Sequence, residues 1–195
     1  MKTKSNGRPT QPATQGNLLK TGITGGIGSG KSYVCRLLEQ HGIEVYDCDA
    51  EAKRLMRTSP AIQQALKQLV GSTEKADIAR FLLQDDAHAK AVDAIVHPAV
   101  FQDFLASGKQ WMESAIMYES GIDRLVDRVV VVTAPEEVRI CRIMQRDGIS
   151  REQARKWMER QWPQDEVRRR ADFEIVNDGI ADLAAQIEQL LGIIA

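Results

Sequence analysis

The chain has 195 residues, of which 43% are hydrophobic and 27% are charged, with a formal net charge of −1. This length and composition predict one globular α/β domain, and the near-neutral charge argues against a nucleic-acid partner. No apolar run approaches the roughly 20 residues that a membrane helix needs, and the N-terminus lacks the apolar stretch of a signal peptide. Three widely spaced cysteines predict reduced thiols in a cytoplasmic protein.

Residues 1–17 are polar and show no hydrophobic period, which predicts a disordered extension before a globular part over residues 18–195. A strand is predicted over residues 18–24, followed by a glycine-rich loop and a helix that ends at Gly42. The sequence IEVYDCD, residues 43–49, alternates apolar and polar side chains. This pattern predicts a second strand that ends in acidic residues.

The middle of the chain has a helical pattern over about residues 50–107, with breaks at Pro60 and Gly71. Three further strands are predicted over residues 111–117, 127–134 and 173–177. The valines of the second of these are typical of a strand buried on both faces. Helices are predicted over residues 135–148, 150–161 and 180–192, and Ser150 with Gln153 forms a capping-box pattern at the start of the second of these helices. Strands that alternate with helices favour a doubly wound parallel sheet.

The segment GGIGSGKS, from Gly25 to Ser32, fits the pattern G-x-x-x-x-G-K-[ST] between a strand and a helix. Glycines let successive backbone N–H groups turn toward one anion, and the following helix adds the positive end of its dipole. Lys31 brings a mobile charge to the β- and γ-phosphates, and Ser32 offers a hydroxyl to Mg²⁺. The segment therefore predicts a P-loop that holds a nucleoside triphosphate, formed by Gly26, Gly28, Ser29, Gly30, Lys31, Ser32 and Tyr33.

Two acidic residues, Asp47 and Asp49, follow the second predicted strand, where ligands of parallel sheets bind. A carboxylate beside the γ-phosphate can orient a substrate hydroxyl and accept its proton. The alternative is that Asp49 caps the following helix. The chain lacks the N-K-x-D segment of switch GTPases, and the valine strand lacks the terminal acid of motor ATPases. These features favour a small-molecule kinase.

Arginines are concentrated between residues 142 and 170. Most of such a charge run is a solvated face, but guanidinium groups on a closing lid can stabilise a transferring phosphoryl group. Arg146, at the turn before the predicted lid helix, is the first candidate, and Arg142 is the second. His97 precedes Pro98, which favours an extended backbone at His97.

The ordered set of motifs resembles the dephospho-CoA kinase family from residue 18 to about residue 191. The matching segments are TGGIGSGKS at residues 24–32, Asp47 with Asp49, His97-Pro98, the segment from Glu113 to Glu119, QRD at residues 145–147, and Gln161, Arg169, Arg170, Ala171, Asp172, Asn177 and Gly179. The chain departs from the family pattern at Tyr33, where threonine is common, and at Glu113, Ala115 and Val167, where aspartate, proline and lysine are usual.

The resemblance implies a P-loop fold with five parallel strands flanked by helices, a helical acceptor-binding insertion over about residues 50–107 and a helical lid over about residues 146–170. It implies transfer of the γ-phosphoryl group of ATP, with Mg²⁺, to the ribose 3′-hydroxyl of dephospho-CoA, the last step of coenzyme A biosynthesis. The implied catalytic residues are Asp49, Lys31 and Arg146. The implied binding residues are Asp47, Asp49 and His97 for the acceptor, Arg142, Asn177 and Gly179 for the nucleotide, and Ser32 for the metal ion.

Two other interpretations stay open from the residues alone. The protein could phosphorylate another small hydroxyl acceptor, such as a nucleoside or a nucleoside monophosphate, because the helical pattern does not define the acceptor pocket. It could also sense or hydrolyse ATP without an acceptor. Asp49 argues against a sensor, since sensing needs no acid to orient a hydroxyl. The oligomeric state does not follow from the sequence.

Overall fold

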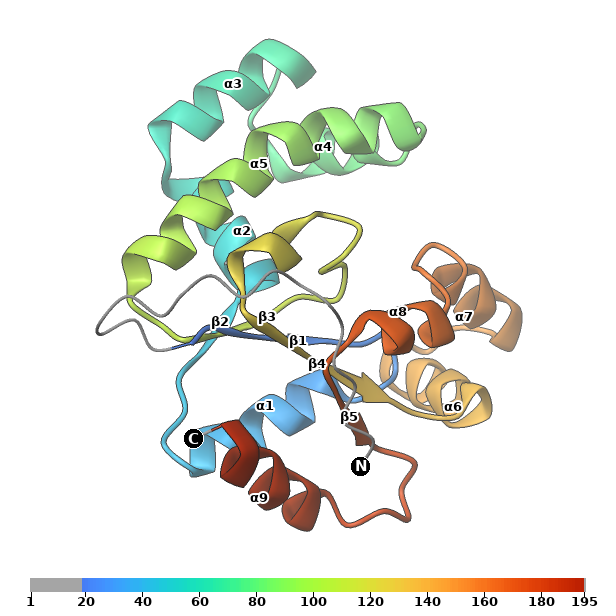
Figure 1. Cartoon of the computed structure of the whole chain (residues 1–195). Coiled ribbons are helices and arrows are strands. Elements are labelled where there is room, and N and C mark those ends of the chain that lie inside the picture. The colour runs from blue at the N-terminus through green and yellow to red at the C-terminus, as the bar shows by residue number, and fades with distance from the viewer. Residues whose placement is uncertain (1–18, 195) are drawn as a thin grey trace. The chain divides into compact units, whose positions relative to one another are not determined.

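A computed structural model describes residues 19–194, which divide into two compact units (Figure 1). The first unit combines the residues before Tyr46 with those after Lys109, and the second is Tyr46–Lys109. The extension expected over residues 1–17 lies outside the described residues. Among the described residues, no helix combines the length and the apolar character needed to cross a membrane.

Five parallel strands form one sheet in the order β2-β3-β1-β4-β5, which confirms the predicted sheet. Thr21 pairs with Trp111 on one side and with Arg128 on the other, so β1 lies at the centre of the sheet. The P-loop therefore leaves a strand that is supported on both sides. The strands are β1 (Thr21–Thr24), β2 (Val45–Asp47), β3 (Trp111–Glu113), β4 (Arg128–Thr133) and β5 (Phe173–Val176).

Strand β3 is shorter than the predicted range of residues 111–117, because it ends at Glu113. The chain then turns, and the 3₁₀ helix η1 (Ile122–Leu125) follows before β4. Met117 is fully buried, and its Sδ occupies the space that a Cβ at Gly22 would need. Met117, which was predicted to belong to the third strand, therefore lies in the turn and packs against β1.

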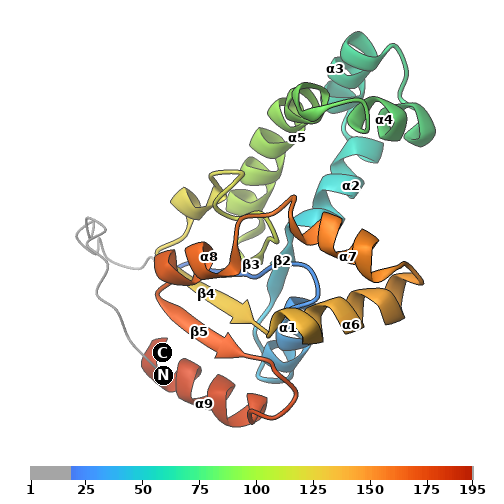
Figure 2. The same ribbon diagram turned by 90° about the vertical axis from the view of Figure 1, so that its right-hand side faces the viewer.

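One face of the sheet is covered by α1 (Lys31–Gln40) and α9 (Leu183–Ile194), which lie side by side in Figures 1 and 2. Val130 and Val132 of β4 point into this core, whereas Val129 and Val131, equally buried, lie on the other face. The prediction that β4 is buried on both faces is confirmed. Each such aliphatic side chain contributes about 1.5–3 kcal/mol on burial. This core includes Ile23, Val34, Leu38, Trp111, Ile175, Ile187 and Leu190.

Helices α6 (Glu136–Asp147) and α7 (Arg151–Met158) pack together through Ile140, Ile143 and Ala154. Gly148 ends α6 with φ +66°, and the Ser150 hydroxyl caps α7 by accepting the Gln153 N–H. A separate helix, α8 (Gln164–Arg170), follows Pro163 and buries Val167. The sequence pattern did not separate α8 from the lid. Helix α8 lies on the opposite side of the sheet from α9 in Figures 1 and 2.

The second unit is helical, with α2 (Cys48–Thr58), α3 (Pro60–Val70), α4 (Lys75–Leu82) and α5 (Asp86–Ser107). The predicted breaks are confirmed, since Pro60 begins α3 and Gly71 follows it with φ +83°. Residues four apart on α5 form the buried face of this helix, namely Val92, Val96, Val100 and Phe104.

The expectation of an extended backbone at His97 is wrong, because α5 continues through Pro98. A proline inside a helix costs about 3 kcal/mol through a lost hydrogen bond and a steric clash. Val96 and Val100, on either side of it, are at most 4% exposed. Burial of such side chains contributes about 1.5–3 kcal/mol each, which offsets the proline.

Candidate active site

The P-loop, Gly25–Ser32, follows β1 directly and depends on glycine at defined points. Gly28 has φ +81° and Gly30 has φ +89°, a backbone region that L side chains rarely adopt. A Cβ at Gly28 would lie 2.7 Å from the carbonyl oxygen of Arg139, and one at Gly30 would collide with Nδ2 of Asn177. The loop can therefore curl this tightly only without side chains at these two positions.

Side chains from distant elements hold the carbonyl groups of the P-loop. Arg139 Nε donates to the carbonyl oxygen of Ile27 at 2.9 Å. Asn177 Nδ2 donates to the carbonyl oxygen of Ser29 at 2.9 Å, and Arg142 Nη1 donates to the same oxygen at 3.3 Å. In a trans peptide the next N–H points opposite to the carbonyl. Fixing these oxygens therefore directs the N–H groups of Gly28 and Gly30 to the other side of the loop.

Arg142 and Asn177, two residues predicted to bind the nucleotide, are hydrogen-bonded to each other. Arg142 Nη2 donates to Asn177 Oδ1 at 3.2 Å, and Arg142 Nη1 donates to the Asn177 carbonyl at 3.0 Å. Gly179, in the same loop after β5, has φ +90°. The Asp178 carboxylate accepts the N–H groups of Ile180 and Ala181, which keeps its pKa below the usual range and fixes the turn.

Lys31 begins α1 and pairs with the carboxylate that ends β3. Its Nζ lies 3.0 Å from Oε1 of Glu113, and the two side chains are only 11% and 12% exposed. Helix α1 has no side-chain cap and no acidic residue in its first turn. An uncapped helix N-terminus with a lysine beside it is an anion site, because its N–H groups and its dipole both favour negative charge.

The other residues of the predicted P-loop site differ in exposure. Ser29 is fully buried, and its hydroxyl has no hydrogen-bond partner within the described residues. Ser32 is exposed in the first turn of α1. Tyr33 is 47% exposed, and the Arg36 guanidinium lies 5.6 Å from its ring centroid. The tyrosine ring thus lies at the surface, and its backbone N–H donates to the carbonyl oxygen of Gly30 at 3.0 Å.

Arg146, the predicted lid arginine, ends α6 with its side chain 61% exposed. Its Nε and Nη2 both donate to the carboxylate of Asp147. Most of the other basic side chains of this region also form ion pairs, which supports a solvated face for them. The pairs are Arg151–Glu137, Arg155–Glu136, Lys156–Glu152, Arg168–Glu174 and Arg170–Glu166.

Asp47, Asp49 and His97 belong to the second unit and are described by their own surroundings. Asp47, not Asp49, caps α2: its Oδ1 accepts the Ala50 N–H at 2.9 Å. The alternative interpretation of Asp49 as the cap is therefore wrong by two residues, and Asp49 lies exposed in the first turn. His97 stacks on Phe101, and its Nε2 lies 3.5 Å from Asp93 Oδ1.

The described residues contain no group of three or more His, Cys, Asp or Glu side chains that could hold a metal ion. Mg²⁺ in kinases usually keeps several waters and is bound by a few protein oxygens together with the substrate phosphates. An exposed hydroxyl such as Ser32, next to an anion site, fits that mode of binding. It does not fit a metal that needs a cage of protein ligands.

Comparison with known proteins shows to which family the chain belongs. A family model described as dephospho-CoA kinase matches residues 19–182. The chain belongs to the dephospho-CoA kinase family. A dephospho-CoA kinase of Bacteroides fragilis is 40% identical over 191 residues, covering 89% of this chain and 91% of the relative. That of Chlorobaculum tepidum is 35% identical over 194 residues, covering 88% and 93%.

Solved structures share the fold of this chain. The crystal structure of TT1252 from Thermus thermophilus matches with a TM-score of 0.78 and 30% identity, covering 91% of this chain and 98% of that one. The dephospho-CoA kinase of Campylobacter jejuni has a TM-score of 0.59 at 21% identity, covering 90% and 94%. A shikimate kinase of Acinetobacter baumannii, with a TM-score of 0.54 at 19% identity, shares the fold. The family is one of kinases that use ATP.

Two P-loop supports in this member of the dephospho-CoA kinase family were missed as site residues. Arg139 is 6% exposed, and burial lowers the pKa of its guanidinium group. Gln161, after α7, accepts the Ile27 N–H with Oε1 at 2.7 Å. Arg139 stands three positions before Arg142, so both lie on one face of α6. That spacing could have pointed to Arg139, whereas nothing local marks Gln161 as a loop contact.

Gly28→Ala is expected to weaken ATP binding at least tenfold. The alanine would meet the backbone of Arg139, which cannot move aside as a flexible side chain can, and the loop N–H groups would lose their direction. Isothermal titration with ATP measures the change. Gly42→Ala is the matched control, because Gly42 has φ +78° with no neighbour within 4 Å of the added Cβ. Equal ATP affinity for the two variants would contradict this account of the loop.

Proposed function

We propose that this protein transfers the γ-phosphoryl group of ATP to the ribose 3′-hydroxyl of dephospho-CoA, giving CoA and ADP. The observation that carries the proposal is the P-loop with Lys31 at an uncapped helix N-terminus, in a chain of the dephospho-CoA kinase family. The cytoplasm is the compartment that we propose, because an odd number of widely spaced cysteines favours reduced thiols.

In this proposal the loop N–H groups and Lys31 hold the β- and γ-phosphates. Lys31 exchanges its ion pair with Glu113 for the phosphates, so one anionic partner replaces another at the same ammonium group. Arg142 and Asn177 hold the loop carbonyls on the face opposite the phosphates, and Gly179, in the same loop as Asn177, is proposed to contact the nucleotide. Ser32 supplies the hydroxyl ligand of Mg²⁺, which neutralises charge on the phosphate oxygens.

Asp49 orients the acceptor hydroxyl and accepts its proton. Ligands of parallel α/β sheets bind beyond the carboxyl ends of the strands, and Asp49 comes two residues after the end of β2. Asp47 is engaged as the cap of α2, so it acts by holding the first turn in which Asp49 lies. His97 is proposed as a further contact of the acceptor.

Arg146 stabilises the transferring phosphoryl group when the lid closes. To do so, its guanidinium group must leave the carboxylate of Asp147. Because Arg146 is exposed at the end of α6, losing this ion pair costs little free energy. A lid that brings in charge only during transfer stabilises the transition state more than the ground state.

The proposed function is tested by ADP release with ATP and Mg²⁺ in the presence of dephospho-CoA or of a panel of nucleosides and nucleoside monophosphates. Release stimulated by dephospho-CoA alone, with an equal amount of CoA formed, is the expected result. Stimulation by a different acceptor would overturn the substrate but retain the mechanism. ATP binding without stimulation by any acceptor would favour the sensor interpretation.

A further inference from the structure

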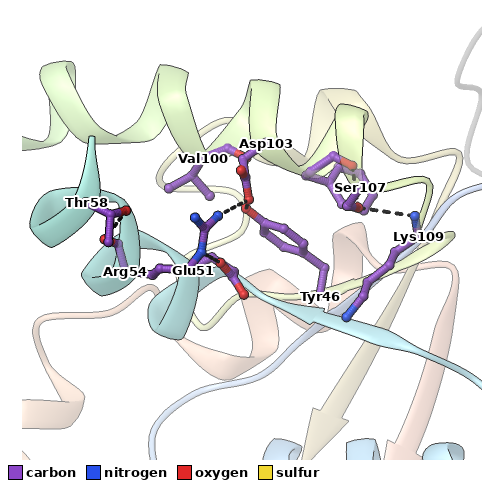
Figure 3. A network of polar contacts seen from close by, with 9 residues as sticks. Tyr46, Glu51, Arg54, Thr58, Val100, Asp103, Ser107 and Lys109 are labelled. Atoms are coloured by element: carbon purple, nitrogen blue, oxygen red, sulfur yellow. Dashed lines mark hydrogen bonds and ion pairs between the residues drawn. The ribbon is translucent and has the colours of Figure 1, made fainter. Parts of the chain in front are cut away.

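A polar network in the second unit surrounds the junction between β2 and α2, and it has no role in the proposed mechanism so far. Figure 3 shows Tyr46 and Arg54 directed at one carboxylate, that of Asp103 on α5. The Tyr46 hydroxyl donates to Asp103 Oδ2 at 2.8 Å, and Arg54 Nη2 donates to the same oxygen at 2.8 Å. Arg54 also pairs with Glu51, one turn earlier on α2.

The network brackets the proposed acceptor-side acids in the sequence. Tyr46 immediately precedes Asp47, and Arg54 lies five positions after Asp49, in the second turn of α2. Asp103 therefore contacts the chain on both sides of the junction that carries the two acids. Because both ends of the junction are tied to one oxygen on α5, neither the strand end nor the helix can rotate without breaking a hydrogen bond.

Tyr46 is the buried member of this network, whereas the side chains of Arg54 and Asp103 are partly exposed. Tyr46 is 3% exposed, and its ring packs edge-on against Phe104 with centroids 5.4 Å apart. Burial and the hydrogen bond to Asp103 both raise the pKa of Tyr46, so it donates as a neutral phenol. Burial opposes ionisation of Asp103, but the hydrogen bonds from Arg54 and Tyr46 outweigh it and lower the pKa of its carboxyl group. Without Asp103 the Tyr46 hydroxyl would keep only its longer contact, with the carbonyl oxygen of Val100 at 3.3 Å.

We propose that Asp103 is a positioning residue of the phosphoryl transfer: through Tyr46 and Arg54 it fixes the β2–α2 junction and thereby aims the Asp49 carboxylate at the acceptor hydroxyl. The role rests on the proposed function, in which Asp49 is the acid. Misplacement of a reacting group by about 1 Å can cost on the order of a hundredfold in rate, so a clamp of this kind affects turnover without touching the substrate.

Asp103→Asn is the test, because asparagine keeps the volume but removes the negative charge that strengthens the hydrogen bonds from Tyr46 and Arg54. CoA formation is expected to fall at least tenfold in kcat, with the Kd for ATP within twofold of wild type. Tyr46→Phe, which keeps the ring packing, should lower kcat in the same direction. Asp77→Asn is the matched control, since it removes the surface ion pair with Arg80 in the same unit, and it should leave both quantities within twofold.

A double-mutant cycle with Asp49→Asn separates positioning from general destabilisation. If Asp103 acts through Asp49, adding Asp103→Asn to Asp49→Asn causes no further loss of kcat at a temperature well below the melting point of every variant. A full tenfold loss in both backgrounds would overturn the proposal, as would CoA formation within twofold of wild type for both Asp103→Asn and Tyr46→Phe.

Hydrogen exchange of the Ala50 amide, which is bonded to Asp47, gives a readout that does not depend on the reaction. Asp103→Asn is expected to speed this exchange, and an unchanged rate would overturn the clamp. Failure of the wild-type protein to form CoA would instead overturn the proposed function. The two failures are therefore distinguishable.

Discussion

Replacing Lys31 by alanine is expected to lower kcat/KM for CoA formation by about 10²- to 10³-fold, which corresponds to about 3–4 kcal/mol of transition-state stabilisation. The lysine is the mobile full charge at the P-loop, and the negative charge on the phosphates cannot be matched by backbone N–H groups alone. Steady-state measurement of CoA formation against both substrates gives the value. Activity within a few-fold of wild type would remove Lys31 from the proposed mechanism.

The ion pair with Glu113 offers a way to separate catalysis from stability in this experiment. Removing one partner of a nearly buried pair leaves the other charge uncompensated, which destabilises the fold. The double variant Lys31→Ala with Glu113→Gln should therefore recover melting temperature but not activity. Lys67→Ala, at an exposed position of α3, controls for the loss of a lysine and should change neither. Recovery of activity by Glu113→Gln would show that the loss came from folding.

The features that the sequence predicted well are those specified by local chemistry. The valine run of β4, the glycine loop, the Pro60 and Gly71 breaks and the Ser150 cap each follow from residues within a few positions of one another. Such signals are read from hydrophobic periodicity, from the φ that a residue can adopt and from a single capping hydroxyl. They were sufficient for the fold and for the P-loop.

The features that the sequence did not reveal are set by contacts between distant segments. Arg139 donates to the carbonyl oxygen of Ile27, 112 residues earlier in the chain, and Asp103 accepts from Tyr46, 57 residues earlier. The local sequence pattern around one partner does not indicate the other. The helical backbone of His97 follows from the burial of its neighbours on α5, which overrides the local preference before proline. Helix α2 begins two residues earlier than predicted, so its cap is Asp47 and not Asp49.

Asp49→Asn is expected to lower kcat for CoA formation by about 10²- to 10⁴-fold while the Kd for ATP stays within twofold. Asparagine retains the size of the side chain but can neither accept the proton nor carry the charge that orients the hydroxyl, and general-base contributions have this magnitude. The effect should appear in kcat, because the acid acts on the acceptor during transfer and not on ATP. Single-turnover CoA formation and ATP titration measure the two quantities separately.

Asp47→Asn is the matched control for Asp49→Asn, because the two residues lie two positions apart and lose the same charge. Asparagine is as good a helix cap as aspartate, so the Ala50 N–H keeps its partner and α2 keeps its start. If Asp47 acts only by holding the first turn, its variant should lose far less turnover than that of Asp49. The opposite ranking would transfer the role of base to Asp47. A loss of ATP affinity with unchanged turnover for Asp49→Asn would exclude a base at that position.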